Sequence, residues 1–130
     1  MGRVLALDYG SARCGVALSD PTGTLATPIE AVERPATRRG LARIAGLVRE
    51  HGVERVVVGL PLGLSGRDTA QTTEARAFAD TLRERVGPRV EVVLEDERFT
   101  TRLAQRSGGS ETAEDSRAAA ILLEGWLARR

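Results

Sequence analysis

The stretch VLALDYGSARCGVALSD, residues 4–20, decides the fold. Its first letters, VLALD (4–8), form a short apolar run that ends in Asp8, a pattern typical of a strand buried on both faces. DYGSAR (8–13) contains the residues of a turn, and CGVALSD (14–20) is apolar again. The stretch therefore predicts a β-hairpin in which an acid closes the first strand.

The rest of the chain adds strand and helix patterns in alternation. A third strand is expected over 23–33, where Pro28 indicates an edge or a bend. The elements expected after it are, in chain order, a helix over 37–52, a strand over 53–61, a helix that begins near Asp68, a strand over 89–96, a short helix after RFTT (98–101) and a helix over 113–128. This order predicts an α/β fold: a mixed five-stranded sheet that starts with a β-hairpin, continues through βαβ crossovers and is flanked by helices.

Local signals mark the helix ends and one buried face. His51, the only histidine, stands where the first helix should end, and we interpret it as a capping residue. Asp68 can cap the following helix, with Gln71 three residues later. In the last helix, Thr112 has capping-box spacing to Asp115. Helical spacing also predicts one stripe there, formed by Asp115, Ala118, Ala119, Leu122 and Trp126.

Length and composition bound the class of protein. The 130 residues predict a single domain over 1–130, and 42% hydrophobic with 28% charged residues is typical of a soluble globular protein. No apolar run approaches the roughly 18 residues of a membrane span. Asp8 also interrupts the first apolar run, so we expect no signal peptide, no membrane partner and a cytoplasmic location. The single cysteine, Cys14, permits no internal disulfide and is interpreted as a small buried residue.

The missing residue types exclude several kinds of catalysis. The chain has no lysine, and all 19 of its basic residues are arginine. This removes the P-loop lysine, Schiff-base chemistry and a Ser–Lys dyad. A Ser–His–Asp or Cys–His mechanism would have to use His51, which already has a capping role. If the protein is an enzyme, carboxylates with a metal ion are therefore the expected catalytic groups.

Acidic residues stand at strand ends and at the start of the last helix. Asp8 ends the first strand, Asp96 and Glu97 end the last strand, and Asp115 opens the final helix. Parallel strands have their carboxyl ends at one edge of a sheet, so these acids could converge there. Each also has a structural interpretation: Asp8 as a turn residue, Asp96 and Glu97 as partners of Arg98, and Asp115 as part of a cap. Convergence would favour Mg²⁺ or Mn²⁺ and the hydrolysis of phosphodiesters.

Four segments resemble the YqgF/RuvX family: LALDYGSARCGVALSD, VVVGLPLGLSG, EDERFTT and EDSRAAAILLEGWL. They follow the family's order and span essentially the whole chain. The resemblance implies a ribonuclease H-like fold related to RuvC-type Holliday junction resolvases. It also implies a nuclease that matures the 5′ end of 16S ribosomal RNA, with resolution of branched DNA as the alternative. A resolvase makes paired symmetric cuts, so that alternative requires a homodimer.

The resemblance also assigns roles to residues. The family's acidic triad maps onto Asp8, Glu97 and Asp115, which would be the catalytic residues and the ligands of Mg²⁺ or Mn²⁺. Arg98 and Thr100 resemble its residues at the substrate edge. Gly59, Pro61 and Gly66 fall in its Gly/Pro loop. Family members often carry a longer, lysine-rich segment before the last aspartate. Here that segment, 102–115, is short and has no lysine, so contacts to nucleic acid would fall to arginines such as Arg13, Arg67, Arg98, Arg102 and Arg117.

Two further classes of function stay open at the level of sequence. The first segment also resembles the phosphate loop of actin-like and sugar-kinase-like ATPases, but those proteins need two such lobes and this chain supplies one. The other class is a non-catalytic nucleic-acid-binding assembly factor that keeps the fold. An intact set of acids favours a nuclease over such a factor. Structured RNA and branched DNA both remain candidate substrates.

Overall fold

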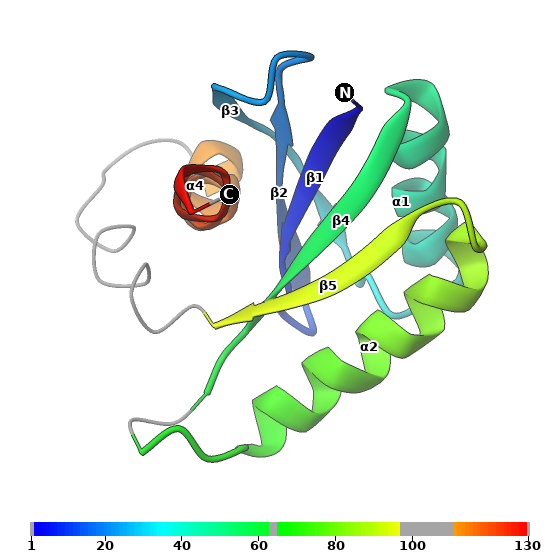
Figure 1. The fold of residues 1–130 in the computed structure, drawn as a ribbon. Helices are drawn as coiled ribbons and strands as arrows, with labels where there is room; N and C mark the ends of the chain where they lie inside the picture. Colours follow the sequence, from blue (N-terminus) through cyan, green and yellow to red (C-terminus); the bar gives the residue numbers. More distant parts are fainter. Residues whose placement is uncertain (1, 63–64, 97–110, 130) are drawn as a thin grey trace.

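A computed structural model describes residues 2–62, 65–96 and 111–129, with side chains described from residue 116 onward in the last of these ranges. Three strands come first along the chain, and helices and strands alternate after them (Figure 1). The elements are β1 (Arg3–Asp8), β2 (Arg13–Ser19), β3 (Ala26–Glu33), α1 (Arg38–Glu50), β4 (Val53–Leu60), α2 (Ala70–Val86), β5 (Glu91–Asp96) and α4 (Glu111–Ala128). All five expected strands are present within a few residues of their predicted bounds. The short helix expected after RFTT lies outside the described residues.

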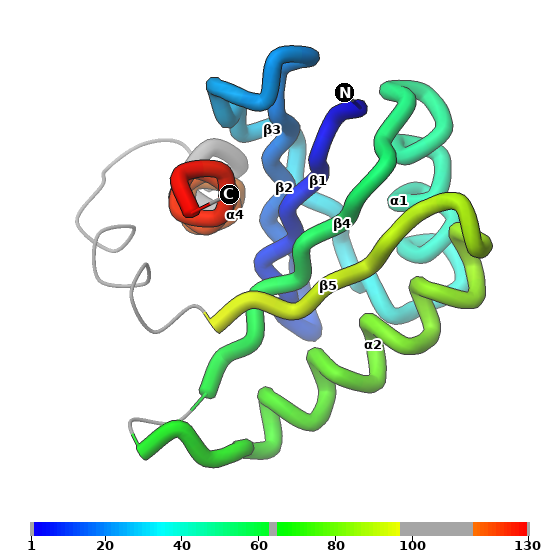
Figure 2. Tube along the Cα trace, in the orientation of Figure 1, coloured from blue at the N-terminus to red at the C-terminus, as the bar shows by residue number. Residues whose placement is uncertain are grey.

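The strands form one mixed sheet in the order β3-β2-β1-β4-β5. The first three pair antiparallel as a hairpin and its extension, and β1, β4 and β5 pair parallel. Figure 2 shows β1, β4 and β5 running in the same direction, so their carboxyl ends lie toward the same edge. The predicted hairpin start followed by crossovers is therefore confirmed.

Helices cover both faces of this sheet. Helices α1 and α2 lie on one face and α4 lies on the other (Figure 1). Alternation along β1 divides its side chains accordingly, because successive residues of a strand point to opposite faces. Leu5 and Leu7 belong to the cluster with α1 and α2, whereas Val4 and Ala6 belong to the cluster with α4. We call the two sides the α1/α2 face and the α4 face.

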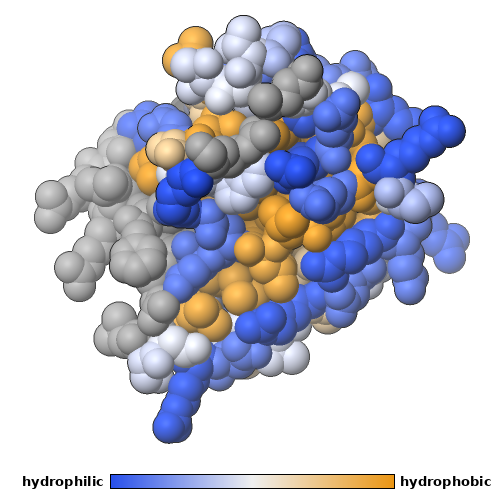
Figure 3. Space-filling model, in the orientation of Figure 1, coloured by the Kyte–Doolittle hydropathy of each residue, from blue (hydrophilic) through white to orange (hydrophobic). Residues whose placement is uncertain are grey.

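The edge strand β5 is only partly buried. Val92 is buried, and the residues after it, Val93 and Leu94, are half-buried. Figure 3 shows apolar surface over the region of β5 and α2, bordered by hydrophilic side chains.

Cys14 is buried in the core of the α1/α2 face, as its position in an apolar run predicted.

The C-cap of α1 agrees with the sequence prediction, and the N-cap of α2 does not. His51 is the C-cap of α1, and its backbone N–H donates to the carbonyls of Leu47 and Arg49. The predicted cap at Asp68 is wrong, because Thr69 is the N-cap of α2. Asp68 instead forms an ion pair with Arg76, at 2.9 Å between a carboxylate oxygen and Nε.

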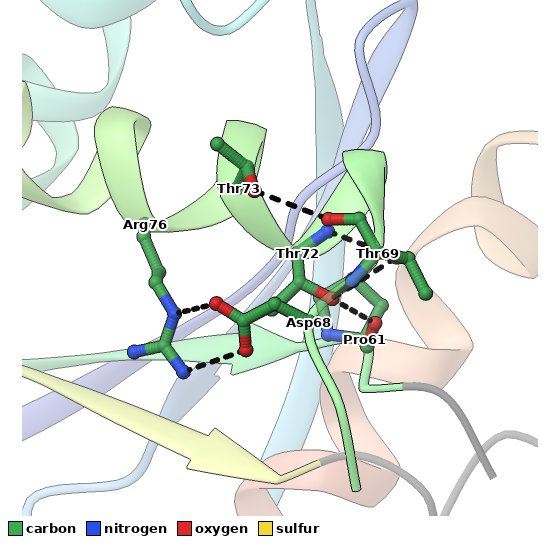
Figure 4. A network of polar contacts seen from close by, with 6 residues as sticks. All are labelled: Pro61, Asp68, Thr69, Thr72, Thr73 and Arg76. Atoms are coloured by element: carbon green, nitrogen blue, oxygen red, sulfur yellow. Dashed lines mark hydrogen bonds and ion pairs between the residues drawn. The ribbon is translucent and has the colours of Figure 1, made fainter. Parts of the chain in front are cut away.

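A threonine pair explains why α2 starts at this point (Figure 4). The Thr69 hydroxyl accepts from the Thr72 backbone N–H at 3.3 Å, and the Thr72 hydroxyl accepts from the Thr69 N–H at 2.9 Å. Thr72 is fully buried and also donates to the Pro61 carbonyl at 2.7 Å. This capping box therefore ties the start of α2 to the residue that follows β4.

Candidate functional site

The carboxyl ends of the three parallel strands define the candidate site. In the register of the sheet, Leu7 of β1 pairs with Val58 of β4. Two residues further along β4, Leu60 pairs with Asp96 of β5. Strands lie about 4.8 Å apart, so the ends of β1 and β5 are separated by one intervening strand, roughly 10 Å. The topology therefore brings the ends of the first and last strands to one edge, as the sequence predicted.

Asp8 lies on the α4 face at that edge. It follows Val4 and Ala6 at intervals of two along β1, and it is half-buried. Its partner across the hairpin is Gly15 of β2, which has no side chain. The residue beside Asp8 on β2 is therefore a glycine. Asp8 lies on the face of the sheet against which α4 packs.

In the motif DYG at positions 8–10, Tyr9 and Gly10 each have a structural role in the turn after Asp8. Tyr9 points to the α1/α2 face, where its ring packs against Phe78 with centroids 4.7 Å apart. Burial raises the pKa of the Tyr9 phenol, and the charges of Glu74 and Cys14 add to this. Gly10 is required because a Cβ there would lie 2.6 Å from the Arg13 carbonyl oxygen. Tyr9 thus anchors the turn that follows Asp8, a role that sequence analysis did not identify.

Helix α4 is held on the opposite side of the hairpin by Ser116. This serine is fully buried, and its hydroxyl accepts from the Val16 backbone N–H at 3.2 Å. The same hydroxyl donates to the Ile29 carbonyl of β3. Val16 directly follows Gly15, the strand partner of Asp8. The turn of α4 that carries Asp115 is therefore fixed on the hairpin close to Asp8.

The start of α4 differs from expectation, whereas its buried stripe agrees with expectation in part. The helix begins at Glu111, which places Thr112 inside its first turn and not at the N-cap. Among the side chains described from residue 116 onward, the buried ones are Ser116, Ala119, Ala120, Leu122 and Leu123, whereas Ala118 and Trp126 are half-buried. The described buried side chains thus follow Ser116 at intervals of three, four, six and seven residues. A serine reads as polar in a periodicity analysis, but its two hydrogen bonds to backbone allow full burial.

The remaining predicted site residues fall into two groups. Glu97, Arg98, Thr100 and Arg102 lie outside the described residues, as does the side chain of Asp115. Arg13 at the start of β2 and Arg67 before α2 are exposed, and Arg117 on α4 is half-buried next to Ser116. In the Gly/Pro loop, Gly66 has a φ of 82°, a left-handed conformation that favours glycine.

Asp8 offers carboxylate oxygens as ligands at this edge. Carboxylates are the ligands that Mg²⁺ and Mn²⁺ prefer, and Asp8 contributes one from a half-buried position. Within 2–62, 65–96 and the described side chains of α4, no group of three or more His, Cys, Asp or Glu could hold a metal ion. Asp8 is the only member of the predicted triad with a described side chain. Its chemistry and its place at the strand end fit a hard divalent cation.

Comparison with known proteins identifies the family. A family model described as "RuvX: Holliday junction resolvase" matches residues 2–129. The chain belongs to the RuvX family. RuvX relatives include proteins named "Putative pre-16S rRNA nuclease" from Mycolicibacterium paratuberculosis, 44% identical over 99% of this chain and 81% of the relative, and from Nocardia farcinica, 46% identical over 99% and 79%. The resemblance seen in four sequence segments is therefore confirmed.

The solved structures confirm the fold of this RuvX protein. The structure "T. thermophilus RuvC in complex with Holliday junction substrate" superposes with a TM-score of 0.62 at 16% identity, covering 99% of this chain and 96% of that one. A second structure of Thermus thermophilus RuvC gives a TM-score of 0.61. This likeness confirms the ribonuclease H-like fold. Among the described residues, none of the helices has the length and apolar character needed to cross a membrane.

Proposed function

We propose that this RuvX protein is a divalent-metal-dependent endonuclease that processes the 5′ end of precursor 16S ribosomal RNA. One observation carries the proposal. Asp8 lies at the carboxyl edge on the α4 face, and Ser116 fixes the turn of α4 that contains Asp115 on the neighbouring strand. The names of the relatives at 44% and 46% identity support the substrate. The proposal keeps the single nuclease domain over 1–130 and the cytoplasmic location expected from the sequence.

The proposed ligands of Mg²⁺ or Mn²⁺ are Asp8, Glu97 and Asp115. A divalent ion bound by carboxylates supplies charge stabilisation to the phosphodiester and lowers the pKa of water. Asp8 approaches from β1 and Asp115 from α4. Glu97 follows β5, in which Val93 and Glu95 already face α4: Val93 packs in the α4-face cluster and Glu95 pairs with Arg129. Three elements would therefore each deliver one carboxylate.

Arginines would hold the nucleic acid against this edge. Arg13 begins β2 five residues after Asp8, and Arg117 lies two residues after Asp115. We assign phosphate contacts to these two, to Arg67 and to the Arg98–Thr100 segment. Guanidinium groups suit such contacts because they donate two parallel hydrogen bonds to a phosphate. Binding should accordingly weaken as salt is raised.

The test is a cleavage assay with the variant Asp8→Asn. The substrates are a fragment of precursor 16S ribosomal RNA and a four-way DNA junction, each with Mn²⁺, with Mg²⁺ and with chelator. We expect the variant to lose more than about 100-fold in rate while retaining its fold by circular dichroism. Asp20→Asn is the matched control, because Asp20 is also an acid after a hairpin strand but lies at the opposite edge of the sheet. Full cleavage by Asp8→Asn would refute the assignment.

Junction resolution is the second candidate function. The family model is described as a Holliday junction resolvase, and the RuvC structure of similar fold was solved with a junction. A resolvase should act as a two-fold dimer and cut opposing strands in pairs. Paired nicks on the junction, with a dimer in sedimentation, would favour this candidate over RNA processing. Binding without cleavage under every metal condition would instead favour a non-catalytic assembly factor.

A further inference from the structure

We propose that Ser116 is a positioning residue, whose hydroxyl sets the place of the α4 turn that carries Asp115 relative to Asp8. This inference rests on the proposed function, because it concerns the ligands of the same site. It goes beyond that function because it gives Ser116, which is not a proposed metal ligand, a role in positioning the ligands. Four observations support it: the hydrogen bonds of Ser116 to β2 and β3, its burial, the small residues around it and its neighbours along the chain.

The hydroxyl of Ser116 bridges two strands where their pairing is irregular. Cys14 of β2 pairs with Val32 of β3, and Val16 pairs with Ile29. Two steps along β2 thus correspond to three along β3, which is the mark of a β-bulge. Ser116 accepts from the N–H of Val16 and donates to the carbonyl of Ile29. One side chain of α4 therefore connects a donor on β2 with an acceptor on its β3 partner.

Only a small hydroxyl residue suits this position. Ser116 has no exposed surface, and Ala119 and Ala120, one turn further along α4, are buried against the same face of the sheet. Alanine at position 116 would leave the buried N–H of Val16 and the half-buried carbonyl of Ile29 without this partner, and the loss is costly for the N–H because water does not reach it. A larger residue would push the helix away from the strands.

The chain positions link this hydrogen bond to both acids. Ser116 directly follows Asp115, and its partner Val16 directly follows Gly15, which pairs with Asp8. The path from one acid to the other therefore runs through a single hydroxyl and a few backbone bonds. A metal ligand must be held to within a fraction of an ångström, so a helix that is free to slide would bind the ion weakly. Ser116 removes that freedom without touching the ion.

Ser19 provides a matched control for a purely structural serine. It is 1% exposed, and its hydroxyl accepts from the Val4 N–H at 2.8 Å. Like Ser116, it satisfies a backbone donor of the sheet from a buried site. Ser19 ends β2 and therefore lies at the edge opposite Asp8. Ser19→Ala and Ser116→Ala should both lower Tm, because both leave a buried N–H without its acceptor.

The experiment measures binding of Mn²⁺ alone to the full chain by titration calorimetry, with thermal unfolding and amide exchange measured in parallel. Ser116→Ala should weaken Mn²⁺ binding on the order of tenfold and speed exchange of the Val16 amide, while Ser19→Ala leaves both unchanged. Ser116→Cys keeps a weak donor and acceptor of small size, so its Mn²⁺ affinity should fall between those of wild type and Ser116→Ala. If Ser116→Ala does not fold, Ser116→Cys tests the proposal in its place.

Two outcomes would overturn the inference. If Ser116→Ala and Ser116→Cys bind Mn²⁺ as tightly as wild type, Ser116 does not position the site. If Ser19→Ala weakens Mn²⁺ binding as much as Ser116→Ala, the effect is a general loss of stability. In either case the proposed function stands provided that Asp8→Asn abolishes both Mn²⁺ binding and cleavage. Failure of the proposed function has a different signature, namely wild-type cleavage by Asp8→Asn.

Discussion

The two faces of the sheet are built from side chains of different size. The α1/α2 face is filled with large aliphatic and aromatic residues, among them Leu5, Leu7, Ile44, Leu82 and Phe78. Half of the buried residues on the α4 face are alanines, namely Ala6, Ala17, Ala119 and Ala120, beside Val4, Val57 and two leucines of α4. Bulky layers keep helices at a distance from the sheet, whereas alanines let a helix backbone approach closely. Only on the α4 face does a helix side chain hydrogen-bond into the β2–β3 ladder, within the described part of the chain.

This difference suggests that the α1/α2 face mainly stabilises the fold, whereas the α4 face sets the position of the helix next to Asp8. Burial of large apolar surface on the α1/α2 face supplies most of the hydrophobic free energy, since that term scales with area. Close contact on the α4 face fixes one helix on the strand next to Asp8. Substitutions on the first face should therefore lower stability with little effect on metal binding. Substitutions on the second should affect both.

The largest loss of stability is expected for Leu82→Ala. Leu82 is fully buried in α2 on the α1/α2 face, and a leucine-to-alanine change in a core costs about 2–5 kcal/mol. Urea denaturation should show this loss, while the Mn²⁺ affinity of the folded protein stays at the wild-type value. A fall in Mn²⁺ affinity as large as that of Ser116→Ala would break the division between the faces.

The same substitution on both faces sharpens the comparison. Ala79 of α2 and Ala119 of α4 are each fully buried, on the α1/α2 face and the α4 face respectively. Leucine at either position overpacks the core, at a cost of about 1–3 kcal/mol. Only Ala119→Leu should also weaken Mn²⁺ binding and cleavage, because it displaces the helix that carries Asp115. Equal losses of Mn²⁺ affinity in the two variants would show that small residues on the α4 face have no special role.

A smaller effect is expected at the start of α2. Thr69→Ala removes the N-cap acceptor for the Thr72 N–H, which costs about 1 kcal/mol of stability. The Thr72 hydroxyl still donates to the Pro61 carbonyl, so the connection to the end of β4 persists. Thermal unfolding should record the loss, and cleavage per folded molecule should stay near wild type. A collapse of cleavage would show that this cap, on the α1/α2 side, also positions the site.

The smallest effect is expected at Asp20, which packs on neither face. Hydrogen bonds from the Thr22 hydroxyl and from the backbone N–H groups of Leu25 and Thr24 lower the pKa of its carboxyl from 3.8 to about 2. A lowered pKa in the folded state means that the carboxylate stabilises the fold at pH 5 and above, and that this contribution disappears as the pH falls toward 2.

The corresponding measurement is urea denaturation of wild type and Asp20→Asn at pH 6 and pH 2.5. Wild type should lose slightly more stability than the variant between these two values, since only wild type carries this titrating group. The difference should be modest because the site is exposed to solvent. A variant that loses as much stability as wild type would show that the turn does not favour the charged form.

The elements of this fold were predictable because their signals are local. Apolar runs mark the strands, and the turn letters between 8 and 13 predict the hairpin. The cap of α2 was mispredicted because Asp68 and Thr69 are adjacent and both residue types are good N-caps. Thr69 wins because Thr72 can complete its capping box while also reaching the Pro61 carbonyl. A preference for one cap over its neighbour depends on such tertiary partners.

The sequence by itself determined the order of the strands and helices, the family and the three acids proposed for the site. Tertiary structure decided which face each element covers, and that the hydroxyl of Ser116 is fully buried under α4. The physical reason is the distance along the chain. The two backbone partners of Ser116 are 100 and 87 residues away from it. Periodicity reports only whether a residue is polar, and the burial of a hydroxyl depends on partners that folding brings to it.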